Sequence, residues 1–179
     1  MVEIDLQLAG VLITATSVTI AAIFYVINLR ETTKNRKITL TTTLMHPFCM
    51  TEEGMRLFID LTAMNWKDIE DFKAKYDSRV NPENYSKRFA FWNMCENFGR
   101  LYREGLIDLE TLYGGSNFLI QISWTKFKPV IEAYRGGDFS VNHLENWEYL
   151  AGKLNEFHLK KTGEDYNAKM ESILAGHGE

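Results

Sequence analysis

One uncharged stretch near the N-terminus constrains this chain more than any other feature. Residues 6–29 read LQLAGVLITATSVTIAAIFYVINL and carry no side chain that is charged at neutral pH. As a helix, at about 1.5 Å per residue, these 24 residues would be about 36 Å long, against about 30 Å of bilayer hydrocarbon. The buried helix of a soluble core is an alternative, but such helices are usually shorter and rarely uncharged for so long. We therefore predict a transmembrane helix over residues 6–29.

A cleaved secretory signal is a second alternative for this stretch. Such a signal has basic residues before a shorter apolar run and small residues at a cleavage site after it. Here the acids Glu3 and Asp5 precede a long run that ends in bulky side chains. These features favour a permanent anchor, with residues 1–5 as a short segment outside the cytosol.

The charges after the stretch predict its orientation. Four basic residues follow it: Arg30, Lys34, Arg36 and Lys37. Because basic flanks stay on the cytoplasmic side of a membrane, we expect a single-pass protein of the inner or plasma membrane whose remaining chain lies in the cytosol. The same four cations would contact anionic lipid head groups, each contributing on the order of 1 kcal/mol.

Small and polar residues within the stretch fall along one side of the predicted helix. They occupy six of seven places in a register of alternating three- and four-residue steps, which only Phe24 interrupts. These six residues are Gln7, Gly10, Thr14, Ser17, Ala21 and Asn28. Small residues let transmembrane helices approach closely, and hydroxyl or amide groups can bond between helices. The pattern predicts a packing seam, with ordinary anchor composition and hydroxyls bonded to their own backbone as the alternative.

The rest of the sequence predicts an all-α fold. No segment after Arg30 alternates apolar and polar residues in the manner of a strand, whereas helical spacing recurs along the chain. We expect a basic, threonine-rich neck over residues 30–45 that continues the first helix and ends at His46-Pro47. A cytosolic bundle of about six helices would follow over residues 46–160, and then a mobile tail over residues 161–179.

Capping residues predict the limits of the first helices in this bundle. Thr51, followed by two acids, opens a short helix, and a second short helix covers about residues 66–76. Residues 81–83, Asn-Pro-Glu, combine a capping side chain, a proline that needs no amide partner and an acid at the positive end of the helix dipole. We expect a long central helix from there to about Glu104.

Glycine, proline and capping residues also divide the segment that follows. Asp108 caps a short helix that we expect to end at the glycine pair 114–115. Residues 117–134 then form another helix, with Pro129 as a kink or a restart. Asn-His-Leu-Glu at residues 142–145 resembles a capping box for the last helix of the bundle.

Composition excludes several classes of protein. Two cysteines cannot build a disulfide scaffold, and three prolines exclude a proline-rich spacer. The net charge of −4 argues against bulk nucleic-acid binding, and residues 46–179 are more acidic still, with 16 basic against 21 acidic side chains. In the cytosol Cys49 and Cys95 would be free thiols.

Motifs for catalysis, cofactors and metals are not found. A di-metal site in a helical bundle needs Glu-x-x-His pairs, and no histidine here has a glutamate three places before it. His46 and Cys49 have the spacing of metal ligands, but a closed zinc site needs four ligands and no second pair is near them. No phosphate loop or nucleotide fingerprint occurs. The sequence therefore predicts no catalytic, cofactor-binding or metal-binding residue.

One acid lies on the apolar face of the predicted central helix. Helical spacing places Glu96 between the directions of Phe89 and Trp92. In a structural role it would pair with Arg100, or accept a hydrogen bond from a tryptophan indole or from a backbone amide of a neighbouring helix. In a functional role it would be an acid or base of raised pKa in a pocket. We expect this candidate buried polar residue to have the structural role.

At this helix the sequence also resembles a family. The shared segments are Thr-Lys-Asn-Arg-Lys after the anchor, Phe-Trp-Asn-Met-Cys-Glu-Asn-Phe-Gly-Arg-Leu, Gly-Leu-Ile-Asp and Trp-Thr-Lys-Phe-Lys-Pro. Up to about Leu154 the chain is similar to an uncharacterised prokaryotic family of single-pass, membrane-anchored helical proteins. The resemblance implies an anchored all-helical protein but no reaction, so no functional residue is carried over from it.

Three functional hypotheses follow. The first is a non-catalytic accessory or scaffold subunit of an integral membrane complex, which docks through its cytosolic domain. Its partners would be membrane subunits or a second copy, together with anionic lipid, and neither a cofactor nor nucleic acid is expected. The second is a membrane-tethered sensor or binding module for a soluble protein, and the third is an enzyme with a pocket around Glu96. The absence of catalytic motifs favours the first.

Overall fold

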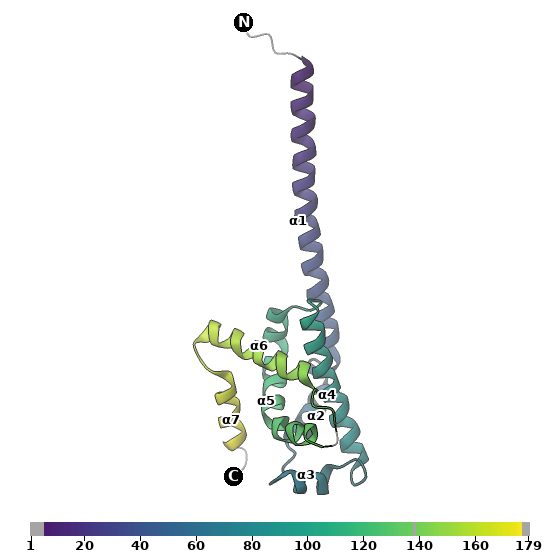
Figure 1. Ribbon diagram of the computed structural model, residues 1–179, viewed down its shortest axis with the longest axis vertical. Helices are drawn as coiled ribbons and strands as arrows, with labels where there is room; N and C mark the ends of the chain where they lie inside the picture. Colours follow the sequence, from purple (N-terminus) through teal and green to yellow (C-terminus); the bar gives the residue numbers. More distant parts are fainter. Residues whose placement is uncertain (1–5, 138, 177–179) are drawn as a thin grey trace. The chain divides into compact units, whose positions relative to one another are not determined.

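Seven helices and no strand make up the part of the chain that the structure, a computed structural model, describes (Figure 1). The described residues are 6–137 and 139–176. The helices are α1 (Leu6–Cys49), α2 (Glu52–Thr62), α3 (Ile69–Tyr76), α4 (Pro82–Arg103), α5 (Leu109–Arg135), α6 (Glu145–Thr162) and α7 (Tyr166–Gly176). The predicted all-α class is confirmed. The chain divides into two compact units, Met1–Thr39 and Leu40–Glu179.

The helix α1 continues past its predicted end. We expected it to stop at His46-Pro47, but it includes Pro47 and ends at Cys49. A proline removes only its own amide from the helical ladder, and the next turn still forms, because the amide of Met50 donates to the carbonyl of His46 at 3.1 Å. The buried side chain of Met45 holds this last part of α1 in the second unit.

The predicted boundary between neck and bundle also shifts. We placed the end of the neck at residue 45, but the second unit begins at Leu40. Thr41 is fully buried, and its hydroxyl accepts a hydrogen bond of 3.1 Å from the amide of Asp108. The end of the threonine-rich segment is therefore part of the packed unit.

The second unit is organised around α4 and α5. As predicted, α4 opens at Asn81, whose side chain accepts a 3.0 Å hydrogen bond from the amide of Asn84. It packs mainly against α6, whereas α5 packs against both α6 and α7. The largest fully buried side chains come from several helices: Phe72, Trp92, Phe98, Phe127 and Trp147. Aromatic residues thus supply much of the apolar surface that the unit buries.

The segment predicted as two helices is a single helix, α5. Asp108 is its N-cap, as expected, and accepts a 2.8 Å hydrogen bond from the amide of Thr111. The predicted break at Gly114-Gly115 is wrong, and Pro129 also lies inside the helix. Gly115 has a packing role instead, because a Cβ atom there would overlap the end of the Met45 side chain. A glycine that lets a neighbouring side chain approach closely need not end a helix.

The capping box predicted at residues 142–145 is wrong. The residue that caps α6 is Leu144, which has a φ of 61° and makes no side-chain capping bond. Its side chain is buried in the core. Burial of Leu144 therefore outweighs the cost of about 1 kcal/mol or more that a left-handed conformation carries for such a residue.

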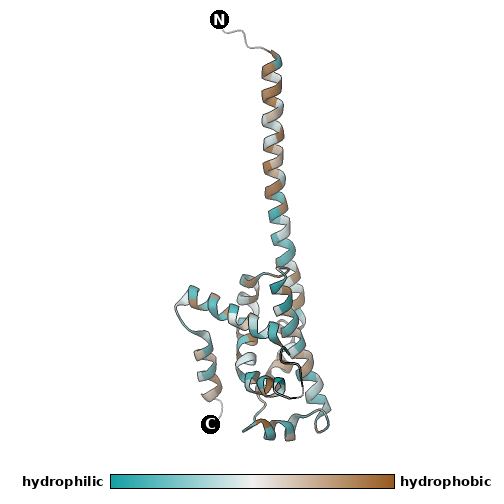
Figure 2. Ribbon diagram, viewed as in Figure 1, coloured by the Kyte–Doolittle hydropathy of each residue, from teal (hydrophilic) through white to brown (hydrophobic). Residues whose placement is uncertain are grey.

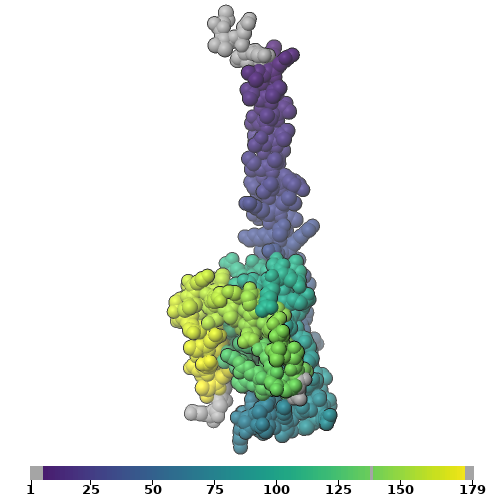
Figure 3. Space-filling view, in the orientation of Figure 1, coloured from purple at the N-terminus to yellow at the C-terminus, as the bar shows by residue number. Residues whose placement is uncertain are grey.

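The segment from residue 161 that we predicted as a tail contains a further helix, α7. The helix α6 ends at Thr162, Gly163 follows with a φ of 79°, and α7 begins at Tyr166. Met170 on α7 is only 1 % exposed. Figure 3 shows α7, in yellow, lying beside α6 on one face of the second unit. Because Tyr166 and Met170 are one turn apart, they form the packed face of α7; residues 177–179 lie outside the described residues.

The contact between α4 and α6 gives a prediction about two glycines. A Cβ atom at Gly99 would overlap the backbone carbonyl of Asn146, whereas a Cβ atom at Gly152 on α6 would meet nothing within 4 Å. We expect Gly99→Ala to lower the free energy of unfolding by about 3 kcal/mol, because the backbone of α6 cannot move aside cheaply. The control Gly152→Ala should raise it by up to about 1 kcal/mol through helix propensity.

The measurement is chemical unfolding of the full chain in detergent for both variants. A Gly99→Ala protein as stable as the unsubstituted chain would contradict the close packing of α4 on α6.

Candidate functional site

The N-terminal part of α1 presents a long surface that is mainly apolar and carries no charged side chain. Figure 2 shows this part of the helix mostly in brown, the colour of apolar residues. Its most apolar 18-residue window has a mean hydropathy of 2.1, and none of it is buried. By length and composition alone this helix could cross a membrane. An exposed apolar surface of this extent is typical of a region that meets a protein partner or lipid.

The hydroxyl groups of the predicted seam bond to their own helix. Thr14 Oγ1 donates to the carbonyl of Gly10 at 2.9 Å, and Ser17 Oγ donates to the carbonyl of Ile13 at 2.8 Å. Thr16 and Thr19, which lie off the seam, make the same bond four residues back. Hydrogen bonding therefore does not distinguish the seam from the rest of the helix. Alanine also occurs off the seam, at Ala9, Ala15 and Ala22, so the one side-chain size that is unique to the seam is that of Gly10, the only glycine in residues 6–29.

The basic residues that follow the apolar segment lie on consecutive turns of α1. Arg30, Lys34 and Arg36 are exposed, and Lys37 is half-buried. The arrangement presents several cations directly after the uncharged segment ends, where they can contact an anionic surface.

The carboxylate of Glu96 on α4 lies at the start of α6. Its Oε2 accepts a 2.9 Å hydrogen bond from the amide of Trp147, and its Oε1 accepts one of 2.6 Å from Nδ2 of Asn146. The first amides of a helix have no partner within the helix, and a negative charge there also interacts favourably with the helix dipole. Glu96 thus caps α6, which Leu144 leaves without a side-chain cap. Arg100 instead bonds to Asn97 and Glu104.

The two cysteines are free, and neither is poised to react. Burial raises the pKa of the Cys49 thiol to about 11. Burial also raises the pKa of Cys95, which is fully buried, well above its usual value. Both thiols therefore stay protonated near neutral pH and react slowly. In the part of the chain that is described, His, Cys, Asp and Glu side chains form no group of three or more that could hold a metal ion.

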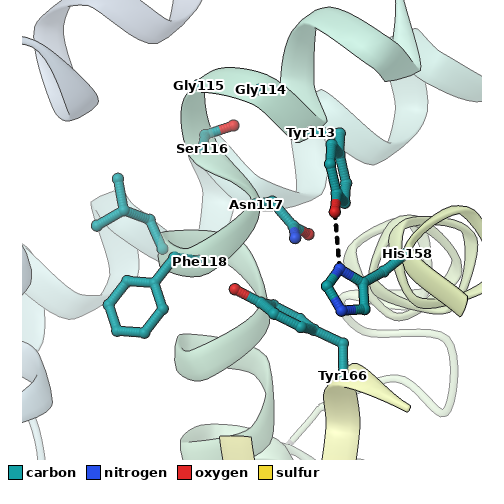
Figure 4. A pocket seen from close by; sticks show the side chains of 9 residues that line it. Tyr113, Gly114, Gly115, Ser116, Asn117, Phe118, His158 and Tyr166 are labelled. Carbon is teal, nitrogen blue, oxygen red and sulfur yellow. Dashed lines mark hydrogen bonds between the residues drawn. The ribbon is translucent and has the colours of Figure 1, made fainter. Parts of the chain in front are cut away.

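A cavity of about 280 Å³ lies between α5, α6 and α7 (Figure 4). Tyr113 and Asn117 reach it from successive turns of α5, His158 from α6 and Tyr166 from the first turn of α7. The hydroxyl of Tyr113 and Nδ1 of His158 are hydrogen-bonded at 2.7 Å. The ring of Tyr166 packs on the imidazole, with 4.3 Å between the ring centroids. Polar and aromatic groups from three helices therefore converge on one small space.

Two features of the sequence conceal this cavity. The predicted helix break at Gly114-Gly115 separated Tyr113 from Asn117, which are in fact one turn apart on the same helix. The predicted mobile tail removed Tyr166 from consideration. The one signal of this cavity in the sequence was the four-residue spacing of Tyr113 and Asn117. This spacing places the two side chains on the same face only if α5 is continuous.

The cap that Glu96 provides leads to a graded prediction. Both of its partners are donors, so Glu96→Gln loses the negative charge and must turn an amide NH₂ toward one of them. We expect Glu96→Gln to lower the free energy of unfolding by about 1 kcal/mol and Glu96→Ala by about 2 to 3 kcal/mol, because alanine leaves the amide of Trp147 unpaired. Thermal unfolding of both variants measures this, with Glu104→Gln, at the exposed C-cap of α4, as the control. Equal stability of all three variants would exclude a capping role.

Comparison with known proteins gives a family but no activity. The chain matches the family described as Domain of unknown function (DUF4760) over residues 11–154. Neither the curated proteins nor the solved structures contain a match. The predicted resemblance to an uncharacterised family is confirmed, and the match covers most of the chain, from the apolar segment of α1 into α6. The chain belongs to the DUF4760 family of domains of unknown function.

Proposed function

We propose that this protein is a non-catalytic accessory subunit of an integral membrane complex, held in the membrane by the N-terminal part of α1. One observation carries the proposal: the apolar window of α1 is fully exposed, which suits a helix that meets lipid or other transmembrane helices. In this arrangement the Leu40–Glu179 unit is the part available for docking outside the bilayer.

The charges that flank the apolar segment support an orientation. Arg30, Lys34 and Arg36 follow it, whereas the charged side chains printed before it are the acids Glu3 and Asp5. Basic flanks favour the cytoplasmic side. We therefore assign residues 1–5 to the outside of the inner or plasma membrane and the second unit to the cytosol. Anionic lipid is the expected partner of the cations.

The role of Glu96 supports a non-catalytic function. It was the side chain on which an enzymatic interpretation rested, and both of its carboxylate oxygens accept hydrogen bonds from residues at the start of α6. A carboxylate in that position stabilises the packing of two helices. The partner of the subunit is a second copy or another membrane subunit, since small residues in the seam permit close approach without choosing between them.

The topology can be tested with introduced cysteines. Cys49 and Cys95 are poor reporters, because burial and the raised pKa of both thiols protect them on either side of a membrane. We expect Val2→Cys to react with an impermeant maleimide in intact cells. Ser78→Cys, at an exposed position before α4, should react only after permeabilisation. The reverse pattern would place the second unit outside the cytosol. Labelling of both cysteines only after permeabilisation, or of both in intact cells, would contradict the membrane span.

The seam can be tested by one chemical change at two places. Thr14 lies on the seam and Thr16 lies off it, and both hydroxyls donate to their own backbone. If helices pack closely along the seam, Thr14→Leu and Gly10→Leu should lower recovery of the complex severalfold, because a larger side chain separates the two backbones. Thr16→Leu should leave recovery unchanged, and leucine should preserve insertion of all three variants.

The measurement is the amount of complex isolated in mild detergent, divided by the amount of membrane-inserted protein. Equal losses for Thr14→Leu and Thr16→Leu would indicate a general effect of composition and would remove the seam from the proposal.

A further inference from the structure

The cavity between α5, α6 and α7 contains buried polar atoms without partners. The side chains of Asn117 and His158 are each 7 % exposed. Within the described part of the chain, Oδ1 of Asn117 and Nε2 of His158 have no hydrogen-bond partner. A buried polar atom without a partner costs roughly 1 to 3 kcal/mol, so such atoms are rare in folded proteins unless they face water or a ligand.

The hydrogen-bonding capacity of these groups is mixed. Tyr113 occupies Nδ1 of His158, which leaves Nε2 as the free ring nitrogen: a donor when Tyr113 donates to Nδ1, and an acceptor in the other tautomer. The amide of Asn117 has a carbonyl acceptor and an NH₂ donor side by side. Figure 4 shows this amide between the hydroxyl of Tyr113 and the ring of Tyr166. The cavity can therefore bond a ligand edge that carries a donor next to an acceptor.

The walls of the cavity favour a flat ligand. The rings of Tyr113 and Tyr166 line it, and none of its described lining residues is Asp, Glu, Lys or Arg. Aromatic rings stack on other planar rings, and a wall without ionised side chains does not select for a charged ligand. A volume of about 280 Å³ is at the lower end for ligand pockets, which suits one small ring system.

We propose that this cavity binds a neutral planar nitrogen heterocycle of nucleobase size. Asn117 bonds the donor–acceptor edge of the heterocycle, as asparagine amides do with the edge of adenine. Nε2 of His158 makes a further hydrogen bond, with Tyr113 as a positioning residue that fixes the imidazole. The tyrosine rings stack on the plane of the ligand. This inference goes beyond the accessory function, because it makes the second unit a site for a small molecule.

Equilibrium dialysis of the full chain in detergent tests the proposal with three probes: adenine, cytosine and D-ribose. Adenine or cytosine should bind with a Kd below about 1 mM, whereas ribose, which is polar but not planar, should not. Asn117→Leu should weaken binding at least tenfold, and Tyr113→Phe should weaken it about fivefold, as expected for losing neutral hydrogen bonds.

Matched variants outside the cavity separate binding from folding. Asn84→Leu removes the amide of a half-buried asparagine whose Oδ1, like that of Asn117, is buried without a partner, and Tyr102→Phe removes a tyrosine hydroxyl from α4. Both variants should bind the heterocycle as tightly as the unsubstituted chain does. The amount of bound heterocycle is divided by the amount of folded protein, which circular dichroism measures. If Asn117→Leu does not fold, the proposal is tested by comparing Tyr113→Phe with Tyr102→Phe, because only the first of these variants should bind the heterocycle more weakly.

The outcomes that overturn the proposal are distinct. They are no retention of either base at about 5 mM, equal retention of ribose, or binding that both cavity variants leave unchanged. None of these outcomes bears on the membrane anchor, whose test uses labelling from outside the cell.

Discussion

The close approach of α4 and α6 is the constraint on which the packing of the second unit depends. At Gly99 the backbone of α6 lies where any other side chain would be, and one turn earlier Glu96 bonds to the first residues of α6. The two interactions fix both the distance between these helices and the point at which α6 begins. Trp147, fully buried, then meets Phe91 of α4 and Trp124 of α5 at ring-centroid distances of 6.2 and 5.3 Å. A single helix start thereby positions an aromatic core shared by three helices.

Local sequence signals predicted the helices well where a side chain caps its own helix. Asn81 and Asp108 each bond to an amide three residues on, and both helix starts could be recognised from the sequence. They failed at α6, because its cap comes from Glu96, about fifty positions away in the chain. The sequence indicated that Glu96 lies on an apolar face, but only the packing of α4 on α6 could show which amide it meets.

Glycine was the second reason why helix boundaries were predicted wrongly from the sequence. Gly114-Gly115 has the composition of a turn, yet both residues are helical, and Gly115 is small because Met45 packs against it. Gly163, by contrast, does end α6, with a φ of 79°. Nothing local distinguishes these two uses of glycine. The cavity was hidden for the same reason, since it depends on α5 being continuous and on α7 being present to supply Tyr166.

The turn of α5 at Gly115 has a mechanical consequence. This turn contributes to the wall of the cavity on one side and contacts Met45, in the last turns of α1, on the other. A residue without a side chain brings the backbone of α5 against the far end of a flexible methionine, a side chain that adapts to irregular gaps. A displacement of this turn of α5 is therefore taken up first by rotation of the Met45 side chain, so the cavity wall can move while the end of α1 keeps its position.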